Sequence, residues 1–258
     1  MNIDNESIND IRKATGTLPS ENPERQTKYL TLDQSLKVSL EDWSHNPYKC
    51  MFIAATSTWG DNNYESKWNK VSNENKLEVI KAVLTHNTLP QAREMVSFIF
   101  RVKGVPRWLF DLHTQTKFTT FMIIGCRDNN KIDCDFVFGD EDEYEFNENV
   151  YEKLKDLYQY TLDQGSGSWQ SARAFLPLNY SHSYHFGQNL LSISSMKFDN
   201  DHLKLLYKYI IESIRNRFPL IGIYLYGLFY HKETIFKYIK DYKYHYLYDH
   251  DKKYFEEE

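Results

Sequence analysis

The stretch "EMVSFIFRVKGVPRWLFDLHTQTK", residues 94–117, decides the fold, because a β-rich run leads into a helical segment within it. Side chains alternate between two faces along 94–102, which predicts a strand. The apolar face of this strand carries Val96, Phe98 and Phe100. Pro106 suits the first turn of a helix, where its missing N–H needs no partner, so 106–117 is predicted to be helical.

The same kind of pattern extends outward in both directions. Apolar residues recur at helical spacing before the stretch and twice after it, and a strand followed by an acidic loop is predicted in 131–146. The predicted helices are 73–87, 148–163 and 201–218, the last capped by Asp199 or Asn200 and stopped by Pro219. The fold class is therefore predicted to be α/β (α+β): a mixed or antiparallel sheet that includes 94–102 and 131–138, packed by long helices.

Composition divides the chain into three parts. Residues 1–30 are rich in Asn, Ser, Glu and Pro, which predicts a mobile N-terminal arm. Residues 31–230 hold the predicted strands and helices and form the main domain. Residues 231–258 form a Lys/Tyr-rich C-terminal extension, interpreted as an aromatic-faced helix with a frayed acidic end.

The charge and composition restrict the class of partner. The 258 residues are 41% hydrophobic and carry a formal net charge of -5. A general nucleic-acid binder needs a basic face to neutralise phosphates, so this charge argues against one and leaves room for a small anionic ligand in a local basic pocket. The 16% aromatic content predicts a strongly aromatic core.

Cysteine usage and hydropathy favour a cytoplasmic protein. The three cysteines are odd in number and have no C-x-x-C spacing, so neither a disulfide framework nor a structural zinc site is indicated. The first thirty residues lack the apolar core of a signal peptide. The longest apolar run, which begins at Phe218, is too short to span a bilayer.

Common catalytic motifs are absent from the sequence. It contains no P-loop, G-x-G-x-x-G, G-x-S-x-G or H-E-x-x-H pattern. His182, His185 and His202 have no carboxylate or Cys at ligand spacing, so no metal site is predicted.

Three blocks, in the same order and at similar spacing, resemble the flavin-dependent thymidylate synthases. The first block, "THNTLPQAREMVSFIF", is similar to G-H-x-[ST]-P-F-E-H-x-x-F-T-F; the second contains Val105 and Arg107 and leads toward the position of the signature R-H-R-x-x-S-x-N-x-x-S-x-R. The third, "SARAFLPLNYSHSYHFGQNLLSISSMKFDND", is similar to A-R-x-x-L-P-L-x-x-Y-T-x-F-x-W-x-x-N-x-R-S-L-x-x-F-L-x-L-R-x-D. The resemblance implies methylation of dUMP with FAD, methylene-tetrahydrofolate and NADPH, in a homotetramer whose active sites lie at subunit junctions.

The sequence departs from this signature where the family holds its flavin. The R-H-R triplet is replaced by Gln115, Thr116 and Lys117, and the arginine of N-x-R is replaced by Leu191. Of the arginines in the signature, only the final one is kept, as Arg127. FAD is therefore expected to bind weakly or to have been lost.

The resemblance assigns roles to individual residues. Arg127 and Arg173 match phosphate-seating arginines, with Thr120 as a further donor, because guanidinium groups hold phosphate bidentately. Lys197 occupies the position of the arginine that polarises the pyrimidine, so it is the catalytic candidate. The residues implied on the flavin side are His86, Lys117 and Asn189. A surface lysine or a structural salt bridge is the competing interpretation of these cations.

Two hypotheses on function follow. The first is C5 methylation or hydroxymethylation of dUMP or a related pyrimidine nucleotide by a diverged enzyme of this kind. The second is a non-catalytic nucleotide-binding or structural homologue that has lost the usual flavin site. A yellow purified protein would favour the first hypothesis.

Overall fold

The structure is a computed structural model, and its chain forms two compact units. It describes residues 28–57, 64–85, 90–116, 119–123, 135–139, 142–163 and 172–256. The smaller unit comprises 1–35, 104–108 and 123–182. The larger unit comprises 36–103, 109–122 and 183–258.

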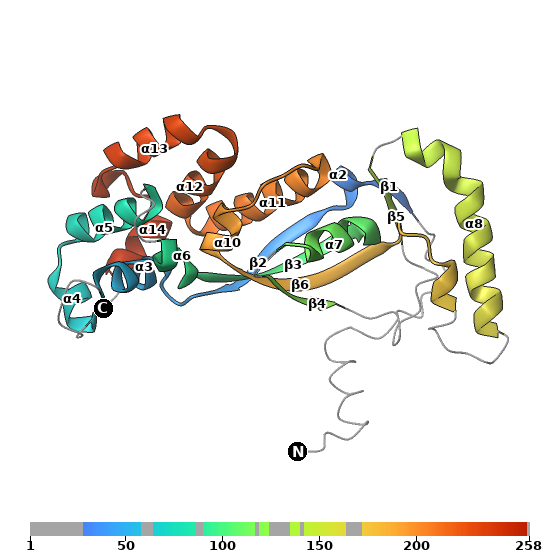
Figure 1. Cartoon of the computed structure of the whole chain (residues 1–258), viewed down its shortest axis with the longest axis horizontal. Coiled ribbons are helices and arrows are strands. Elements are labelled where there is room, and N and C mark those ends of the chain that lie inside the picture. The colour runs from blue at the N-terminus through green and yellow to red at the C-terminus, as the bar shows by residue number, and fades with distance from the viewer. Residues whose placement is uncertain are drawn as a thin grey trace, which may run out of the picture. The chain divides into compact units, whose positions relative to one another are not determined.

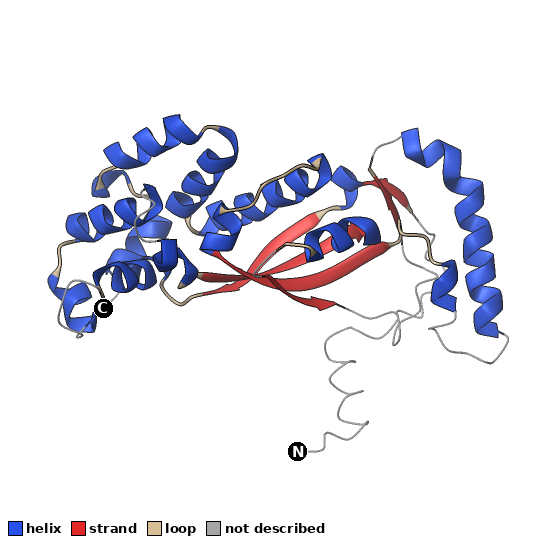
Figure 2. Cartoon of the chain, viewed as in Figure 1, coloured by secondary structure: helices blue, strands red, loops and turns tan. Residues whose placement is uncertain are grey.

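A four-stranded sheet forms the centre of the larger unit (Figure 2). Its order is β2 (Lys37–Trp43), β3 (Ser97–Pro106), β6 (Ser181–Asn189) and β4 (Thr119–Ile123). β2 and β3 are antiparallel, with Leu40 opposite Phe100. Along β3, Phe98 and Phe100 are buried whereas Ile99 between them is exposed, which confirms the predicted apolar face. The strand was predicted over 94–102, but it begins at Ser97, and Glu94 belongs to the preceding helix.

The junction after β3 differs from the prediction. Pro106 is the last residue of the strand, and helix α7 runs from Arg107 to Thr114. The prediction placed Pro106 inside a helix spanning 106–117. Because the fixed φ of proline suits extended backbone as well as a first helical turn, the proline alone did not determine which side of the boundary it occupies.

Helices from the C-terminal half pack on this sheet and on one another. α11 (Asp201–Arg217) runs beside β2 and contacts it (Figure 1). Asn200 caps α11 by accepting a hydrogen bond from the Leu203 amide at 3.0 Å, so the predicted cap and helix are confirmed. The predicted stop at Pro219 begins a further helix, α12 (Pro219–Tyr230), which contacts α11.

The other helices described in the larger unit are shorter than α11. The predicted helix 73–87 is among them as α5, and its last two residues lie outside the described residues. Their bounds are α3 (Pro47–Thr56), α4 (Tyr64–Lys70), α5 (Asn73–Thr85), α6 (Pro90–Glu94), α10 (Leu190–Ser194), α13 (Lys232–Asp241), the 3₁₀ turn η2 (Tyr244–Tyr246) and α14 (Asp249–Glu256). No helix among the described residues is long and apolar enough to cross a membrane.

The C-terminal extension packs into the core of the larger unit. Phe255 is fully buried, and its carbonyl accepts a hydrogen bond from Lys76 Nζ at 2.8 Å. Asp251, also fully buried, accepts hydrogen bonds from the Tyr48 hydroxyl and, at 3.0 Å, from the Leu220 amide. These contacts tie α14 to α3, α5 and the first turn of α12.

A separate two-stranded sheet lies in the smaller unit. β1 (Tyr29–Thr31) pairs in parallel with β5 (Phe136–Phe138). The prediction placed β5 in the same sheet as β3, and this part of the prediction is wrong. Phe136 and Phe138 pack with Tyr180 in an aromatic cluster. The first strand lies at the boundary of the predicted N-terminal arm, of which residues 1–27 lie outside the described residues.

Among its described residues, the smaller unit also contains three helical segments: α2 (Leu32–Ser35), α8 (Asp142–Asp163) and the 3₁₀ turn η1 (Arg173–Phe175). The predicted helix 148–163 is confirmed, but it begins earlier, inside the run interpreted as an acidic loop. Carboxylates are favourable in the first turn of a helix, where the backbone N–H groups carry partial positive charge, so an acidic run can start a helix as well as form a loop.

Candidate functional site

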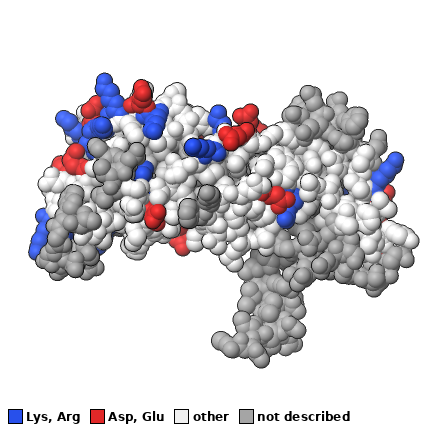
Figure 3. Space-filling model, viewed as in Figure 1, with Lys and Arg blue, Asp and Glu red and all other residues white. Residues whose placement is uncertain are grey.

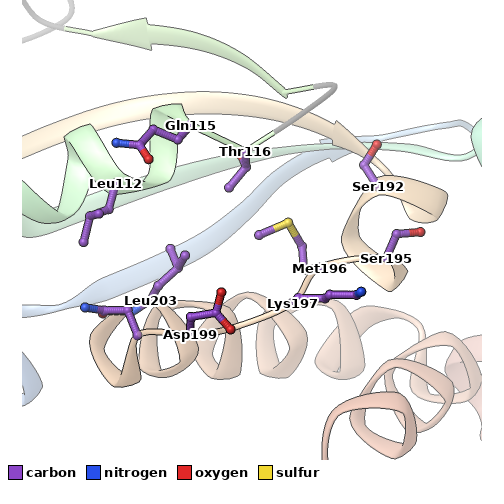
Figure 4. A pocket seen from close by; sticks show the side chains of 10 residues that line it. Leu112, Gln115, Thr116, Ser192, Ser195, Met196, Lys197, Asp199 and Leu203 are labelled. Carbon is purple, nitrogen blue, oxygen red and sulfur yellow. Dashed lines mark hydrogen bonds between the residues drawn. The ribbon is translucent and has the colours of Figure 1, made fainter.

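A pocket of about 620 Å³ lies in the larger unit, between the end of α7 and the segment that joins α10 to α11 (Figure 4). Its size falls within the range of roughly 300–1,000 Å³ that small-molecule pockets occupy. The lining residues are Leu112, Gln115, Thr116, Ser192, Ser195, Met196, Lys197, Asp199, Asn200 and Leu203.

Side-chain caps fix the segment that carries the charged lining residues. Asn189 ends β6 and caps α10, its Oδ1 accepting from the Ser192 amide at 2.8 Å. Asn200 caps α11 in the same way. Lys197 and Asp199 therefore lie on a short connection held between two capped helices.

The opposite wall is the turn that ends α7. The Gln115 amide bonds the Leu112 carbonyl at 3.2 Å, and the Thr116 amide bonds the His113 carbonyl at 3.0 Å. These two bonds tighten the last turn and place both polar side chains at the pocket (Figure 4).

The pocket lining mixes apolar and polar side chains and carries little net charge. Lys197 is the one cation among the described lining residues, and Asp199 is the one carboxylate. Both side chains are exposed to solvent. In Figure 4 Met196 extends into the space between these walls, so a ligand would meet a thioether beside hydroxyl and amide groups.

A buried hydrogen-bond network lies behind Thr116. Thr116 hydrogen-bonds Tyr207, and its Oγ1 lies 3.0 Å from that of Thr119. The Tyr207 hydroxyl donates to Gln188 Oε1 at 3.0 Å and lies 3.3 Å from His113 Nε2. These bonds connect the pocket wall to the sheet and to α11.

His113 completes this network in its neutral form. Burial lowers the pKa of His113 to about 3, so the ring is uncharged near pH 7. Nδ1 of His113 lies 2.7 Å from the Tyr184 hydroxyl and Nε2 lies 3.3 Å from the Tyr207 hydroxyl, so the neutral ring donates to one phenol and accepts from the other. Burial also raises the pKa of Tyr184 and of Tyr207, so the phenols stay protonated. The network positions Thr116 without adding charge to the pocket.

Lys197 is the predicted site residue that the structure places in the pocket. It lies there with Gln115 and Thr116, which occupy two positions of the rewritten R-H-R triplet. Thr120 is exposed on β4 and is not among the lining residues, and Asn189 acts as a helix cap. Their roles toward ligands stay predictions.

The other predicted site residues are not tested by the geometry. His86, Lys117 and Arg127 lie outside the described residues. The backbone of Arg173 belongs to η1 in the smaller unit, and its side chain is not described. The predicted convergence of Arg127 and Arg173 on one phosphate therefore stays a prediction.

Several residues that line the pocket were not predicted from the sequence to be site residues. Leu112, Ser195 and Leu203 carry no chemical signature, and they were found only through the three-dimensional arrangement. Asp199 and Met196 belong to the "MKFD" segment, whose resemblance to L-R-x-D was the available signal.

Metal-binding groups and charged side chains are dispersed in the described part of the chain. No three His, Cys, Asp or Glu side chains there are grouped so that they could hold a metal ion. On the face shown in Figure 3, cationic and anionic side chains are interspersed over α13.

Comparison with known proteins identifies related sequences and folds. The family model described as Thymidylate synthase complementing protein matches residues 39–196, more than half of the chain. A UMP/dUMP methylase from Streptomyces cacaoi, bound with 5-Br dUMP, superposes with a TM-score of 0.63 at 13% identity, covering 78% of this chain and 97% of that one. A flavin-dependent thymidylate synthase from Helicobacter pylori, complexed with FAD and dUMP, gives a TM-score of 0.54 at 14% identity, covering 69% and 93%. No curated protein matches the sequence.

Proposed function

The chain belongs to the thymidylate synthase complementing protein family, and we propose that it transfers a one-carbon unit, as a methyl or hydroxymethyl group, to C5 of the pyrimidine ring of dUMP or a related nucleotide. One observation carries this proposal. Gln115 and Thr116 from one signature block line the same pocket as Lys197 from another, about 80 residues away in the sequence. The similar fold of a UMP/dUMP methylase supports the substrate class.

Lys197 has the chemistry that the reaction needs. When C5 of the ring becomes nucleophilic, negative charge develops on a ring carbonyl oxygen, and an ammonium group near that oxygen stabilises it. Lysine supplies a compact point charge rather than the planar two-donor fork of arginine. Asp199, on the same connection, offers an acceptor for a ring or sugar donor.

The remaining predicted residues complete the proposed site. Arg127 and Arg173 would seat the nucleotide phosphate, with Thr120 as an additional hydroxyl donor. His86, Lys117 and Asn189 would line the flavin side. Methylene-tetrahydrofolate would supply the carbon, and NADPH the reducing equivalents.

The described pocket residues do not fit the pyrophosphate of FAD. That group carries two negative charges, whereas Lys197 is the one described lining cation and Asp199 offsets it. Gln115 and Thr116 supply only neutral hydrogen bonds. We therefore propose that flavin is held weakly, if it is held at all, and we assign no step of the reaction to it.

The assembly and location follow the family resemblance. We propose a homotetramer in the cytoplasm, because the family builds its pockets between subunits and the chain is 16% aromatic. Light scattering on the purified protein tests this proposal. A monomer at micromolar concentration would contradict a shared site.

Nucleotide affinity tests the role of Lys197. Replacing Lys197 by Gln should weaken dUMP binding about tenfold or more, since a hydrogen bond to a charged group contributes roughly 1.5–3 kcal/mol. Lys208→Gln is the matched control, because Lys208 is exposed on α11 and does not line the pocket. Calorimetry with dUMP, UMP and dCMP measures both variants against the wild type. Equal affinities for the two variants would remove Lys197 from the site.

A second function is favoured by the charge balance of the pocket. A homologue with Gln115 and Thr116 in place of Arg and His could bind a nucleotide without catalysing its alkylation. Loss of the C5 proton signal of dUMP, followed by NMR in deuterated buffer with FAD, methylene-tetrahydrofolate and NADPH added, separates the two functions. Binding without C5 exchange supports the non-catalytic homologue. If the wild type binds none of the three nucleotides at millimolar concentration, the enzyme proposal fails.

A further inference from the structure

A second pocket in the larger unit is walled by tyrosines. It has a volume of about 530 Å³ and lies where α13 ends and the chain turns through η2 toward α14. Its lining residues are Tyr238, Asp241, Tyr242, Tyr246 and Tyr248. None of them belongs to the pocket that holds Lys197 or to the three signature blocks.

The tyrosine rings form a floor and inclined walls. Tyr242 is 3% exposed and forms the floor, whereas Tyr238, Tyr246 and Tyr248 are 49%, 58% and 53% exposed. The ring of Tyr242 lies 5.3 Å from that of Tyr238 at an interplanar angle of 58°, and 6.2 Å from that of Tyr246 at 59°. Neither measured pair is parallel, so these rings do not offer a slot for a flat base.

Hydrogen bonds hold the Tyr242 ring and the backbone that carries the other rings. The Tyr242 hydroxyl donates to the Tyr246 carbonyl at 2.8 Å, and the buried Lys81 ammonium donates to the Tyr242 carbonyl at 3.0 Å. The Tyr248 carbonyl accepts from the Asp251 amide at 2.9 Å. A site fixed before binding loses less conformational entropy when a ligand arrives.

The charge of the lining selects the sign of the ligand. Asp241 is the one ionisable acid or base among the lining residues apart from the tyrosines, and burial raises the pKa of Tyr242, which keeps that phenol neutral. A tyrosine ring adds negative electrostatic potential where it presents its face, because an aromatic quadrupole is negative above the ring. Lys237, Lys240 and Lys243 are neighbours in sequence but do not line the pocket.

From these four observations we infer that the tyrosine pocket binds a methylated ammonium group. Such a cation is bulky, weakly hydrated and positive, so it can leave water for several ring faces and one carboxylate at once. An unmethylated ammonium keeps its hydration shell, and a phosphate would be repelled by Asp241. The site is independent of the nucleotide pocket.

Choline is the probe for this site, and its neutral isostere is the control. Titration of choline with the full-length protein should give saturable binding with a dissociation constant on the order of 1–10 mM, since a few cation–π contacts and one carboxylate would hold it. Ligand-observed NMR should show an upfield ring-current shift of the choline methyl protons. The neutral alcohol 3,3-dimethylbutan-1-ol should bind at least about threefold more weakly. Equal binding by the two compounds would overturn the inference.

Variants at the exposed walls locate the site. Tyr246→Ala, Tyr248→Ala and Asp241→Asn should each weaken choline binding about threefold or more. Tyr160→Ala is the matched control, because Tyr160 is 62% exposed on α8 and does not line the pocket. Unchanged melting temperatures would establish that the variants are folded. The inference fails if folded wall variants bind choline as the control does.

A short peptide carrying trimethyllysine distinguishes the two sources of this chemistry. Binding at least about tenfold tighter than choline supports a protein side chain as the natural ligand. Binding equal to choline supports a free small molecule. If neither compound binds saturably, the inference is wrong.

Discussion

Two of the buried polar centres in the described part of the larger unit are built differently. Behind the candidate pocket, His113, Tyr184, Tyr207 and Gln188 form a chain of neutral groups that each donate or accept. Near the C-terminus, the single carboxyl of Asp251 accepts from two donors contributed by other helices. The first centre avoids charge altogether, whereas the second depends on one ionisable acid.

The difference determines how each centre responds to protons. Burial raises the pKa of Asp251 to about 7, although its hydrogen bonds from Tyr48 and from the Leu220 amide oppose this rise. Burial lowers the pKa of His113 to about 3. Two equally buried groups thus favour their neutral forms, one by holding a proton and the other by releasing it.

The largest effect is expected from truncating the neutral centre. His113→Ala should destabilise the protein by about 4 kcal/mol, in the range for removal of a buried ring, because it leaves a cavity and unpaired hydroxyls. The ring is packed edge-on against Phe121, Phe186 and Tyr207. Urea unfolding followed by circular dichroism measures the loss. A loss below about 1 kcal/mol would mean that the centre contributes little to stability.

A smaller effect is expected at the acid centre. Asp251→Ala should cost about 3 kcal/mol, because the Tyr48 hydroxyl and the Leu220 amide would be buried without an acceptor. Asp251→Asn should cost less, since its amide oxygen can accept from Leu220 and its NH₂ can donate to Tyr48. Equal losses for the two variants would contradict the hydrogen-bond account.

The pH dependence separates the two centres most clearly. His113 has its pKa lowered on folding, so its contribution to stability is present above about pH 6.5 and is lost as the pH falls toward 3. Asp251 has its pKa raised from 3.8, so its contribution is present below about pH 4 and is lost as the pH rises through 7. Between these limits the two slopes oppose each other, each at most about 1.4 kcal/mol per pH unit.

A variant at either residue should reveal how the other residue alone makes the free energy of unfolding depend on pH. In Asp251→Asn, stability should rise more steeply than in the wild type between about pH 4 and 6.5. In His113→Gln, the free energy of unfolding should decrease as the pH rises over the same range, in contrast to the wild type, since Gln keeps hydrogen-bonding capacity without titrating. Unfolding free energies at four pH values measure both slopes. Parallel profiles for the wild type and both variants would contradict the assigned shifts.

The features that local pattern determines were predictable from sequence. The buried face of β3 and the cap at Asn200 follow from alternation and from one side chain with its neighbouring amides. The Pro106 boundary was wrong because a proline is compatible with both adjoining structures. The burial of Asp251 could not be predicted, because its partner Tyr48 lies 203 residues away.

The candidate site was predictable only in part. The segment around Lys197 was found through its resemblance to the family motif, and Gln115 and Thr116 were found as departures from it. No role was predicted for His113, which could have served a ligand site or the core, and it is fully buried in the core behind the pocket. A histidine on a mostly apolar helix gives the same sequence signal in either role, and only its burial distinguishes them.

The division of the chain into two units has a consequence for proteolysis and for expression of fragments. The sequence passes from one unit to the other after residues 35, 103, 108, 122 and 182, so neither unit is a continuous segment. A single proteolytic cut therefore cannot release either one, and no simple truncation yields one alone. In the smaller unit, β1 can pair only after β5 has been synthesised. Beside this pair, the Lys28 amide donates to the Asp135 carboxylate, which lies 107 residues later in the sequence. During synthesis by the ribosome, this unit can close only after the chain has supplied most of the strands of the other.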